Sequence, residues 1–516
     1  MLIFNLCNHF QIAGIFNTII KVSINFKISD YKFAKFRKGS IISTMRKSIA
    51  GILCALISSQ VFGVVQRSYV NVEAFDEESE VPQSLFGNYS DDFYRNEESI
   101  LNLTLDQWYR GPHALGNLWG VRTVLDDYGI TPLIGYLGNF AANPWGGDSH
   151  GATNTSSVHL GVGIDLAKLV KSDSLEGWSI GNTWVWRFGE SLTKRYIHNA
   201  FNVQQNYGSQ TIRLQSLYAV YSREIPNTDL RFTLKFGRIA AGDNFLTKPI
   251  YWLYQSNSID GNPVGIFNQL KWSAYPGSTW GAYSQIKHSE GQYFRAGVYQ
   301  INSDRQDSMG MHGLDWSFSG ADGVNANFEL GWDINHDDSG ESPGNISAGF
   351  AADWYNAQYV DNSGRSKPFN CTMYAQADYM IFNLGQVKTD DPRYIKRSED
   401  SYRDLRGIVL WGIVQYDPYE ELARMPWFAS GGLLFNAPFT SRADDVLCLG
   451  FSYGKFSSSL DDPDLRGSYE IAVELNYKFQ INRFSFVQPG VQFIVNTGGG
   501  EYPNAVVFGL QYGLSL

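Results

Sequence analysis

The chain has 516 residues, of which 43% are hydrophobic and 15% aromatic, with 51 glycines and a formal net charge of −10 at pH 7. The acidic balance argues against a nucleic-acid partner, and no run after residue 63 is long and apolar enough for a transmembrane helix. The length suits three ordinary domains or one large barrel, and the many aromatic residues and glycines favour strands and tight turns over a helical enzyme.

Residues 45–63, MRKSIAGILCALISSQVFG, have the layout of a secretory signal peptide. Arg46 and Lys47 form a charged start, residues 49–57 form an apolar core, and Gly63 suits a cleavage site. A short membrane anchor is the alternative, but the apolar core is too short for one. Residues 1–44 lack clear periodicity, so we expect a non-native upstream extension there and the true start at Met45.

Residues 64–115 are expected to form an acidic N-terminal periplasmic segment. Residues 1–63 hold eight Lys and Arg residues and one acidic residue, so cleavage leaves 33 basic and 50 acidic residues, a net charge of −17. Within the segment, residues 73–98 are acidic and lack a strand pattern. They form either a solvated tether or a segment near the mouth of the barrel described next.

Apolar residues alternate with polar ones in several runs, which is the period of a strand with one apolar face. In residues 178–188, Trp178, Trp184 and Trp186 share one face, and Thr183 and Arg187 lie on the other. Further runs and intervening clusters of Gly, Asn, Asp and Pro predict strands at 230–237 and 446–456, and loops at 144–155, 256–263, 303–310, 335–345, 360–368 and 458–467.

The clearest alternation lies at the end of the chain. Every second residue from Tyr469 to Phe479 is apolar, a break follows at 480–483, and residues 484–495 and 506–516 again read as strands. This pattern predicts an all-β fold, a transmembrane antiparallel β-barrel of about 16 strands. A soluble sandwich also alternates, but the signal peptide and the aromatic load favour a barrel. Periplasmic turns of such barrels are short and outer loops are longer. We therefore place the break at 480–483 in the periplasm and expect residues 457–468 and 496–505 to lie outside.

Short motifs run in order from residue 116 to residue 500. They are GNLWGVRTVLDDYGI (116–130), GYLGNFAANPWGG (135–147), VQQNYGSQTIRLQSLYAVYSREI (203–225), LRFTLKFGRIAAGDNF (230–245), GNP (261–263), YPGSTWGAY (275–283), GVYQIN (297–302), DDVLCLGFSYG (444–454), YEIAVELNYKFQINRF (469–484) and VQPGVQFIVNTGGG (487–500). Together they resemble the OprB family of carbohydrate-selective porins. Thr497 stands where that family usually has a proline, and Leu516 where it commonly ends in Phe.

The resemblance implies a 16-stranded porin domain over residues 116–516, located in the bacterial outer membrane. Such a protein passes carbohydrates and small polar solutes by diffusion through a selective constriction, without a cofactor. Its partners would be outer-membrane lipid and a small sugar. Porins commonly form trimers, so a homotrimer is one assembly to test.

Candidate site residues are polar side chains on the predicted inward faces, where charge and hydrogen bonds set selectivity. Carboxylates accept hydrogen bonds from sugar hydroxyls, and guanidinium groups donate to them. The charged candidates are Arg187, Arg231, Lys235, Arg238, Asp243, Glu470, Glu474 and Lys478. The aromatic candidates for stacking on a sugar ring are Tyr251, Trp252 and Tyr254. The alternatives are a solvated wall or an ion pair for the charges, and loop packing or an interface girdle for the rings.

The sequence gives little support for an enzyme or for a metal site. GESPG (340–344) fits a nucleophile pattern but lies in a polar loop without strand-to-helix context. The eight histidines show no metal-ligand spacing. Cys7 and Cys54 lie in the part expected to be removed, and the sequence does not decide whether Cys371 and Cys448 pair.

Two alternatives to a sugar porin remain open. The net charge of −17 motivates a porin for cationic solutes such as basic amino acids. A secreted or surface-bound β-rich adhesin or structural protein would show the same strand alternation.

Overall fold

The computed structural model describes residues 104–206, 211–301, 312–314, 316, 323–335, 341–387, 405–462, 465 and 467–516. All of them belong to one compact unit, Gly63–Leu516. The expected extension 1–44, the signal peptide 45–63 and most of the acidic segment 64–115 lie outside the described residues, as do Cys7 and Cys54.

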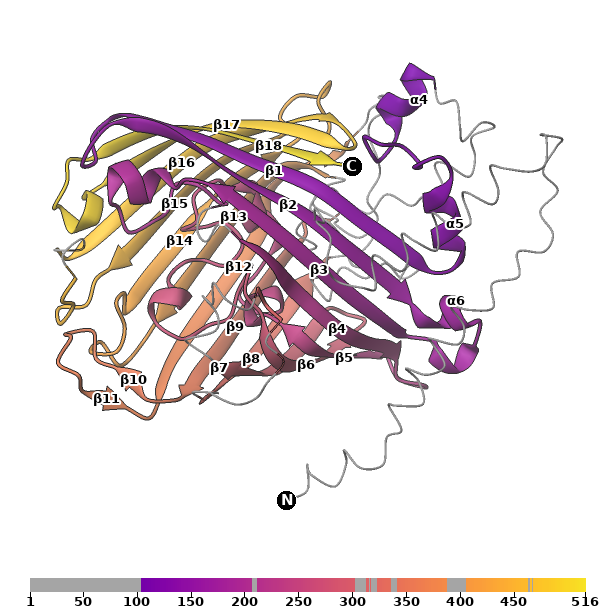
Figure 1. Ribbon diagram of the computed structural model, residues 1–516, viewed down its shortest axis with the longest axis horizontal. Helices are drawn as coiled ribbons and strands as arrows, with labels where there is room; N and C mark the ends of the chain where they lie inside the picture. Colours follow the sequence, from indigo (N-terminus) through magenta and orange to yellow (C-terminus); the bar gives the residue numbers. More distant parts are fainter. Residues whose placement is uncertain are drawn as a thin grey trace. The chain divides into compact units, whose positions relative to one another are not determined.

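The described chain forms a closed antiparallel barrel of 16 strands (Figure 1). Each strand pairs with its neighbours in the chain, and β1 closes the ring by pairing with β18. The strands are β1 (Ile130–Trp145), β2 (Gly151–Asp165), β3 (Trp178–Gly189), β4 (Ile212–Glu224), β5 (Leu230–Ile239), β6 (Thr279–His288), β7 (Gln292–Ile301), β8 (Gly323–Ile334), β9 (Gly344–Trp354), β12 (Asn370–Gln386), β13 (Leu405–Tyr416), β14 (Trp427–Asn436), β15 (Val446–Lys455), β16 (Tyr469–Asn482), β17 (Ser485–Val495) and β18 (Ala505–Ser515). The predicted all-β barrel of about 16 strands is confirmed.

The remaining elements of the described residues are short. They are the α-helices α4 (Leu105–Arg110), α5 (Val121–Asp127) and α6 (Leu166–Val170), the π-helix η3 (Thr193–Ile197), the 3₁₀ helices η2 (Asp173–Leu175), η4 (Ala241–Asp243), η5 (Pro249–Leu253), η6 (Ile266–Asn268) and η7 (Thr497–Gly499), and a two-stranded sheet of β10 (Ala357–Gln358) and β11 (Ser366–Lys367). No helix in the described ranges is long and apolar enough to cross a membrane.

The predicted faces of the strands are also confirmed. In β3, Trp186 is exposed on the outside whereas Thr183 and Arg187 are buried on the inside. In β16, Glu470 and Glu474 are buried inward, and Ile471 and Val473 between them face out. Barrel strands place successive side chains on opposite faces, so the outward apolar face suits lipid.

Three boundaries differ from the sequence prediction. The predicted break at 480–483 is wrong, because β16 continues to Asn482 and pairs with Ser485 across a register shift. The Asn482 carboxamide accepts a hydrogen bond from the Phe484 N–H at 3.2 Å, which closes a turn of only residues 483–484. The predicted loops 144–155 and 335–345 are too long, because β2 starts at Gly151 and β9 at Gly344. Their first inward residues are polar and therefore resemble loop sequence.

The connections differ at the two ends of the barrel. Tight turns join β4 to β5, β6 to β7 and β16 to β17 at one end, called the turn end, and the longest connections lie at the other, called the loop end. Residues 104–129 lie at the turn end, where the Ala114 N–H donates to the Ser515 carbonyl at 2.9 Å. Arg122 donates to the carbonyls of Pro132 and Leu516, at 3.1 and 2.5 Å, and so bridges the seam between β1 and β18.

Candidate functional site

Two connections at the loop end fold back into the barrel. The first inward loop (190–211) joins β3 to β4, and the second inward loop (240–278) joins β5 to β6. Most of their described side chains are buried, and they contact inward-facing residues of strands far away in the sequence. Protein therefore fills a large part of the barrel at the height of these loops.

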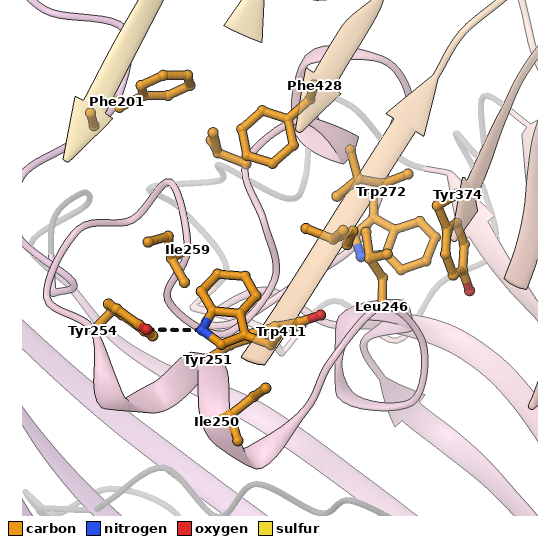
Figure 2. Close-up of a cluster of buried hydrophobic side chains, with 14 of the residues drawn as sticks. Phe201, Leu246, Ile250, Tyr251, Tyr254, Ile259, Trp272, Tyr374, Trp411 and Phe428 are labelled. Carbon is orange, nitrogen blue, oxygen red and sulfur yellow. Dashed lines mark hydrogen bonds between the residues drawn. The ribbon is translucent and has the colours of Figure 1, made fainter. Parts of the chain in front are cut away.

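One side of the second inward loop is apolar and packs on β13. The rings of Tyr254 and Trp411 lie 5.4 Å apart, and the Trp411 indole donates a hydrogen bond to the Tyr254 hydroxyl at 2.9 Å (Figure 2). The Tyr251 ring lies 5.3 Å from that of Trp411. Ile250 and Ile259 extend the same buried cluster. Burial of this apolar surface holds the loop against the wall.

The tip of the second inward loop is held by a carboxylate of β16. Glu474 is buried and accepts hydrogen bonds from the main-chain N–H groups of Gln255 and Ser256, at 2.8 and 2.7 Å. Gln488 on β17 donates to the Leu253 carbonyl at 2.7 Å. The wall thus satisfies backbone groups that would otherwise be buried without partners.

The base of the second inward loop is held by charge. Lys248 forms an ion pair with Asp378 on β12, and its ammonium donates to the Asn345 carboxamide at 2.6 Å. The Tyr251 hydroxyl donates to the Gln376 carboxamide at 2.8 Å. Both charges of the pair are buried, so each depends on the other for stabilisation.

The first inward loop is held by another carboxylate of β16. Glu470 accepts hydrogen bonds from the N–H groups of Ala200 and Phe201, at 2.9 and 3.0 Å, and from that of Gly498 at 2.8 Å. The Phe201 ring packs edge-on against Phe428 of β14, 6.0 Å between centroids. The first inward loop, like the second, is therefore held both by hydrogen bonds to a carboxylate and by apolar packing.

The two inward loops also contact each other. The Asn257 N–H donates to the Asn202 carbonyl at 2.8 Å. The Gln205 amide donates to the carboxylate of Asp260. The loops and β16 therefore form one hydrogen-bonded body inside the barrel.

A polar cluster lies where the second inward loop returns to β6. The Tyr275 ring stacks on His159 of β2 with centroids 5.8 Å apart, and the Arg187 guanidinium lies 5.1 Å from the same ring. Nearby in the chain, the Ser278 carbonyl accepts a hydrogen bond from Arg238 at 2.6 Å. Cationic and aromatic groups of the wall thus meet one stretch of the loop.

The charged residues predicted to line a pore occupy different surroundings. Arg231 and Lys478 are half-exposed near the turn end, with the Lys478 ammonium 4.5 Å from the Phe486 ring. Lys235 is fully buried, donates to the Asn244 carboxamide at 3.2 Å and lies 4.4 Å from the Tyr218 ring.

The other charged candidates contact the inward loops or belong to them. Arg187 and Arg238 are buried against the return of the second loop, Glu470 and Glu474 are buried at the loop tips, and Asp243 lies half-buried in η4. That any of these residues lines the narrowest point stays a prediction.

The three aromatic candidates are likewise divided. Tyr251 and Tyr254 are buried in the cluster on β13, whereas Trp252 between them is half-buried. The Trp252 ring covers the backbone of Gly261, because a Cβ there would lie 2.1 Å from the ring. A sugar-stacking role stays a prediction for all three, and the exposure of Trp252 favours it most.

A charged and aromatic stretch of the inner wall is not among the predicted site residues. Arg295 of β7 donates to Glu329 of β8 at 2.8 Å, and the Tyr374 hydroxyl donates to the other carboxylate oxygen at 2.8 Å. Tyr374 lies flat on its cross-strand partner Gly349, where a Cβ would be 2.1 Å from the ring. Tyrosine paired with glycine recurs on other inward faces, at Tyr218 on Gly181, Tyr293 on Gly331 and Tyr299 on Gly281. Glycines at alternate strand positions were the available signal.

Ion pairs tie three connections together at the loop end. Lys367 of β11 pairs with Glu421, which follows β13. Arg424 of the same connection pairs with Asp462, between β15 and β16, at 2.5 Å. Hydrogen bonds from Ser363 lower the pKa of Asp361 to about 2. These connections therefore form a charged rim.

Asp417 follows β13 and is buried beneath this rim. It accepts a hydrogen bond from the Tyr419 N–H at 2.8 Å. Burial raises the pKa of Asp417 to about 7, although that hydrogen bond opposes the shift. A hydrogen bond with the Asn370 side chain also opposes the shift.

No described group of three or more His, Cys, Asp and Glu side chains could hold a metal ion. Cys371 and Cys448 are buried free thiols. The inside of the barrel therefore brings together opposed donors, acceptors and aromatic rings, which can bind and release a polar solute.

Comparisons with known proteins agree with this architecture. The family model described as "Carbohydrate-selective porin, OprB family" matches residues 149–516. The chain is 24% identical to "Porin B" of Pseudomonas aeruginosa over 442 residues, which are 77% of this chain and 90% of that protein. It is 23% identical to "Putative porin QuiX" of Acinetobacter baylyi over 453 residues, 81% of this chain and 96% of the relative.

A solved structure supports the fold. The "High pH structure of Pseudomonas putida OprB" matches with a TM-score of 0.67 and 21% sequence identity. The match covers 79% of this chain and 99% of that one.

Proposed function

The chain belongs to the OprB family of carbohydrate-selective porins, and from this premise we propose that it passes neutral sugars by diffusion through the space that its two inward loops leave open. The observation that carries the proposal is the pair of loops anchored to the inner wall of a lipid-facing barrel. A barrel of this strand number encloses an aqueous channel unless protein fills it. The loops therefore restrict a wide barrel to a path of molecular size.

The balance of charge inside the barrel supports a neutral solute. Two buried ion pairs lie inside the barrel, one between Arg295 and Glu329 and one between Lys248 and Asp378. Paired charges cancel at a distance but still offer hydrogen-bond donors and acceptors nearby. A sugar hydroxyl can use both kinds of group, which compensates for the water contacts that the solute loses.

The half-exposed aromatic and charged groups of the second inward loop are the candidates for sugar contact. Trp252 offers an aromatic face for the apolar side of a sugar ring. Asp243 offers an acceptor and Tyr275 a hydroxyl on the same loop. Glu470 and Glu474 are less suited to touch the solute, because backbone N–H groups occupy their carboxylates.

Solute flux into liposomes tests the proposal. The purified protein is reconstituted, and entry rates of glucose, arginine and a larger disaccharide are compared. Glucose entry faster than its size predicts supports a sugar porin. Entry that follows size alone would indicate a general porin and contradict the proposal.

A cation-conducting porin is the second candidate, motivated by the net charge of −17 without residues 1–63. The reversal potential in a salt gradient separates the two candidates. A strong cation preference together with fast arginine entry would favour it, and an anion preference would exclude it. The closed barrel and the family favour a channel over an enzyme or a secreted adhesin.

Family and fold place the protein in the outer membrane. Export by the signal peptide 45–63, the extension 1–44 and the role of 64–115 remain proposals that mass spectrometry of the mature protein would test. A homotrimer and lipid contact are also proposals. Migration on gels without boiling and cross-linking in membranes would test the trimer.

A further inference from the structure

We propose that Glu470 and Glu474 are positioning residues of the pore, two carboxylate clamps on one strand that each hold one inward loop in place. The inference rests on the proposed function, because a clamp matters only if the loops bound the solute path. In this role Glu470 and Glu474 fix the width and the stability of the solute path and do not contact the sugar.

The Glu474 clamp uses both oxygens of its carboxylate. The Gln255 N–H donates to Oε1 at 2.8 Å, and the Ser256 N–H donates to Oε2 at 2.7 Å. Asn476 donates a third hydrogen bond to Oε1 at 2.6 Å. Hydrogen bonds to a charged acceptor are about twice as strong as those between neutral groups. Glu474 therefore holds two consecutive N–H groups at the tip of the second inward loop, beside the hydrogen bond from Gln488 to the Leu253 carbonyl.

The Glu470 clamp has the same design. The Phe201 N–H donates to Oε1 at 3.0 Å, and the N–H groups of Ala200 and Gly498 donate to Oε2 at 2.9 and 2.8 Å. Gly498 belongs to η7, between β17 and β18. One carboxylate thus joins the first inward loop to a third connection at the loop end.

The spacing of the two clamps makes them act together. Residues four apart on a strand share a face and lie about 13 Å apart along it. The loops that they hold also touch, through the Asn257 N–H and the Asn202 carbonyl at 2.8 Å. Release of either clamp therefore loosens the contact between the loops as well.

Glutamine is the informative substitution because its shape is nearly that of glutamate. A carboxamide has one acceptor oxygen, and its NH₂ group would face a backbone N–H donor. Glu470→Gln and Glu474→Gln thus keep the packing but break half of each clamp. Loss of a charge-assisted hydrogen bond, roughly 1.5–3 kcal/mol, increases the population of released loops by about 10-fold or more.

The matched control is Asp445→Asn. Asp445 is also buried and also accepts a main-chain hydrogen bond, from the Gln480 N–H at 3.0 Å, but its partners lie near the turn end. Its substitution tests whether any lost buried carboxylate disturbs the pore. Heat-modifiable migration on gels shows for every variant that the barrel has folded.

The test is single-channel recording of the full chain in planar bilayers. We expect both Gln variants to show larger or fluctuating conductance and at least about 10-fold more open-channel noise, with Asp445→Asn like the wild type. Folded Gln variants with wild-type conductance and noise would overturn the proposal. Equal noise from Asp445→Asn would overturn it as well.

A cysteine pair at Asn202 and Asn257 gives a rescue that a general packing defect would not show. Cross-linking the pair in the Glu474→Gln background should restore a steady current, and cleavage of the link should reverse the effect. A fully formed cross-link without restored current would contradict the clamp. If the Gln variants are noisy but the wild-type protein passes no sugar, the clamp is supported and the proposed function is refuted.

Discussion

The inner wall is built in two ways, apolar on β13–β15 and charged on β7–β12. The first sector presents Trp411, Phe428 and Cys448 to the inside, whereas the second presents Arg295 and Glu329. The second inward loop touches both, with its apolar cluster on β13 and its ion pair on β12. An inner wall covered by protein can be apolar, and only a wall that serves water or solute has to be polar.

The difference between the sectors predicts how each holds the loop. Apolar packing contributes in proportion to buried area and tolerates small shifts. A buried ion pair contributes little net stability but fixes position, because separation of the partners leaves a charge without compensation. The apolar sector should therefore dominate stability, and the charged sector should dominate the placement of the loop.

The largest expected effect is in the apolar sector. Trp411→Ala removes the ring that packs on Tyr251 and Tyr254. It should lower the free energy of unfolding by about 4 kcal/mol. Urea unfolding in lipid vesicles measures this change. Trp411→Phe keeps most of the packing and should cost much less, so equal losses in the two variants would contradict the apolar account.

The next effect is in the charged sector. Lys248→Met leaves Asp378 buried without its cationic partner and should cost about 3 kcal/mol in the same unfolding assay. The double variant Lys248→Met/Asp378→Leu should recover most of that stability. It should still show a changed channel conductance, because the loop base has lost its fixed position. A double variant as unstable as the single one would refute this assignment.

Another effect depends on pH and tests the join between the sectors. The raised pKa of Asp417, about 7, means that the folded state binds its proton more tightly than the unfolded state does. Stability should therefore fall as pH rises from about 4 to about 7, by at most about 1.4 kcal/mol per pH unit. Asp417→Asn should flatten this part of the profile. If the wild type and Asp417→Asn show parallel profiles of unfolding free energy against pH, the effect is ruled out.

The smallest effect is expected at the solvated rim. Arg424 pairs with Asp462 at 2.5 Å, but half of the arginine side chain is exposed. Arg424→Ala should cost about 0.2–1 kcal/mol, and less at high salt. Urea unfolding at two salt concentrations measures it. If Arg424→Ala lowered the free energy of unfolding as much as Lys248→Met does, the rim would contribute as much to stability as the interior, which would contradict this prediction.

Sequence patterns predicted the outer face of the barrel better than its inside. Lipid requires an apolar side chain at every second position, so Trp178, Trp186 and Phe508 marked strands without knowledge of any partner. The inward orientation of Glu470 and Glu474 followed from the same alternation. The turn at 483–484 was misjudged because the register shift after Gln480 interrupts the pattern.

The surroundings of the inward residues could not be predicted from alternation. Glu474 meets Gln255 and Lys248 meets Asp378 only because the second inward loop folds back across the barrel. Periodicity within a strand carries no information on such contacts. Tyr251, Trp252 and Tyr254 illustrate the limit, since three neighbours in one motif differ in burial.

Block of single-channel current by glucose tests the central claim most directly. A path narrowed by two fixed loops and lined with hydrogen-bonding groups should hold a sugar long enough to interrupt ion flow. We expect the ion current through the wild-type channel to fall in a saturable way as glucose is added, with less block by an alcohol of similar size. A current that glucose leaves unchanged, in a channel that conducts ions normally, would contradict the account.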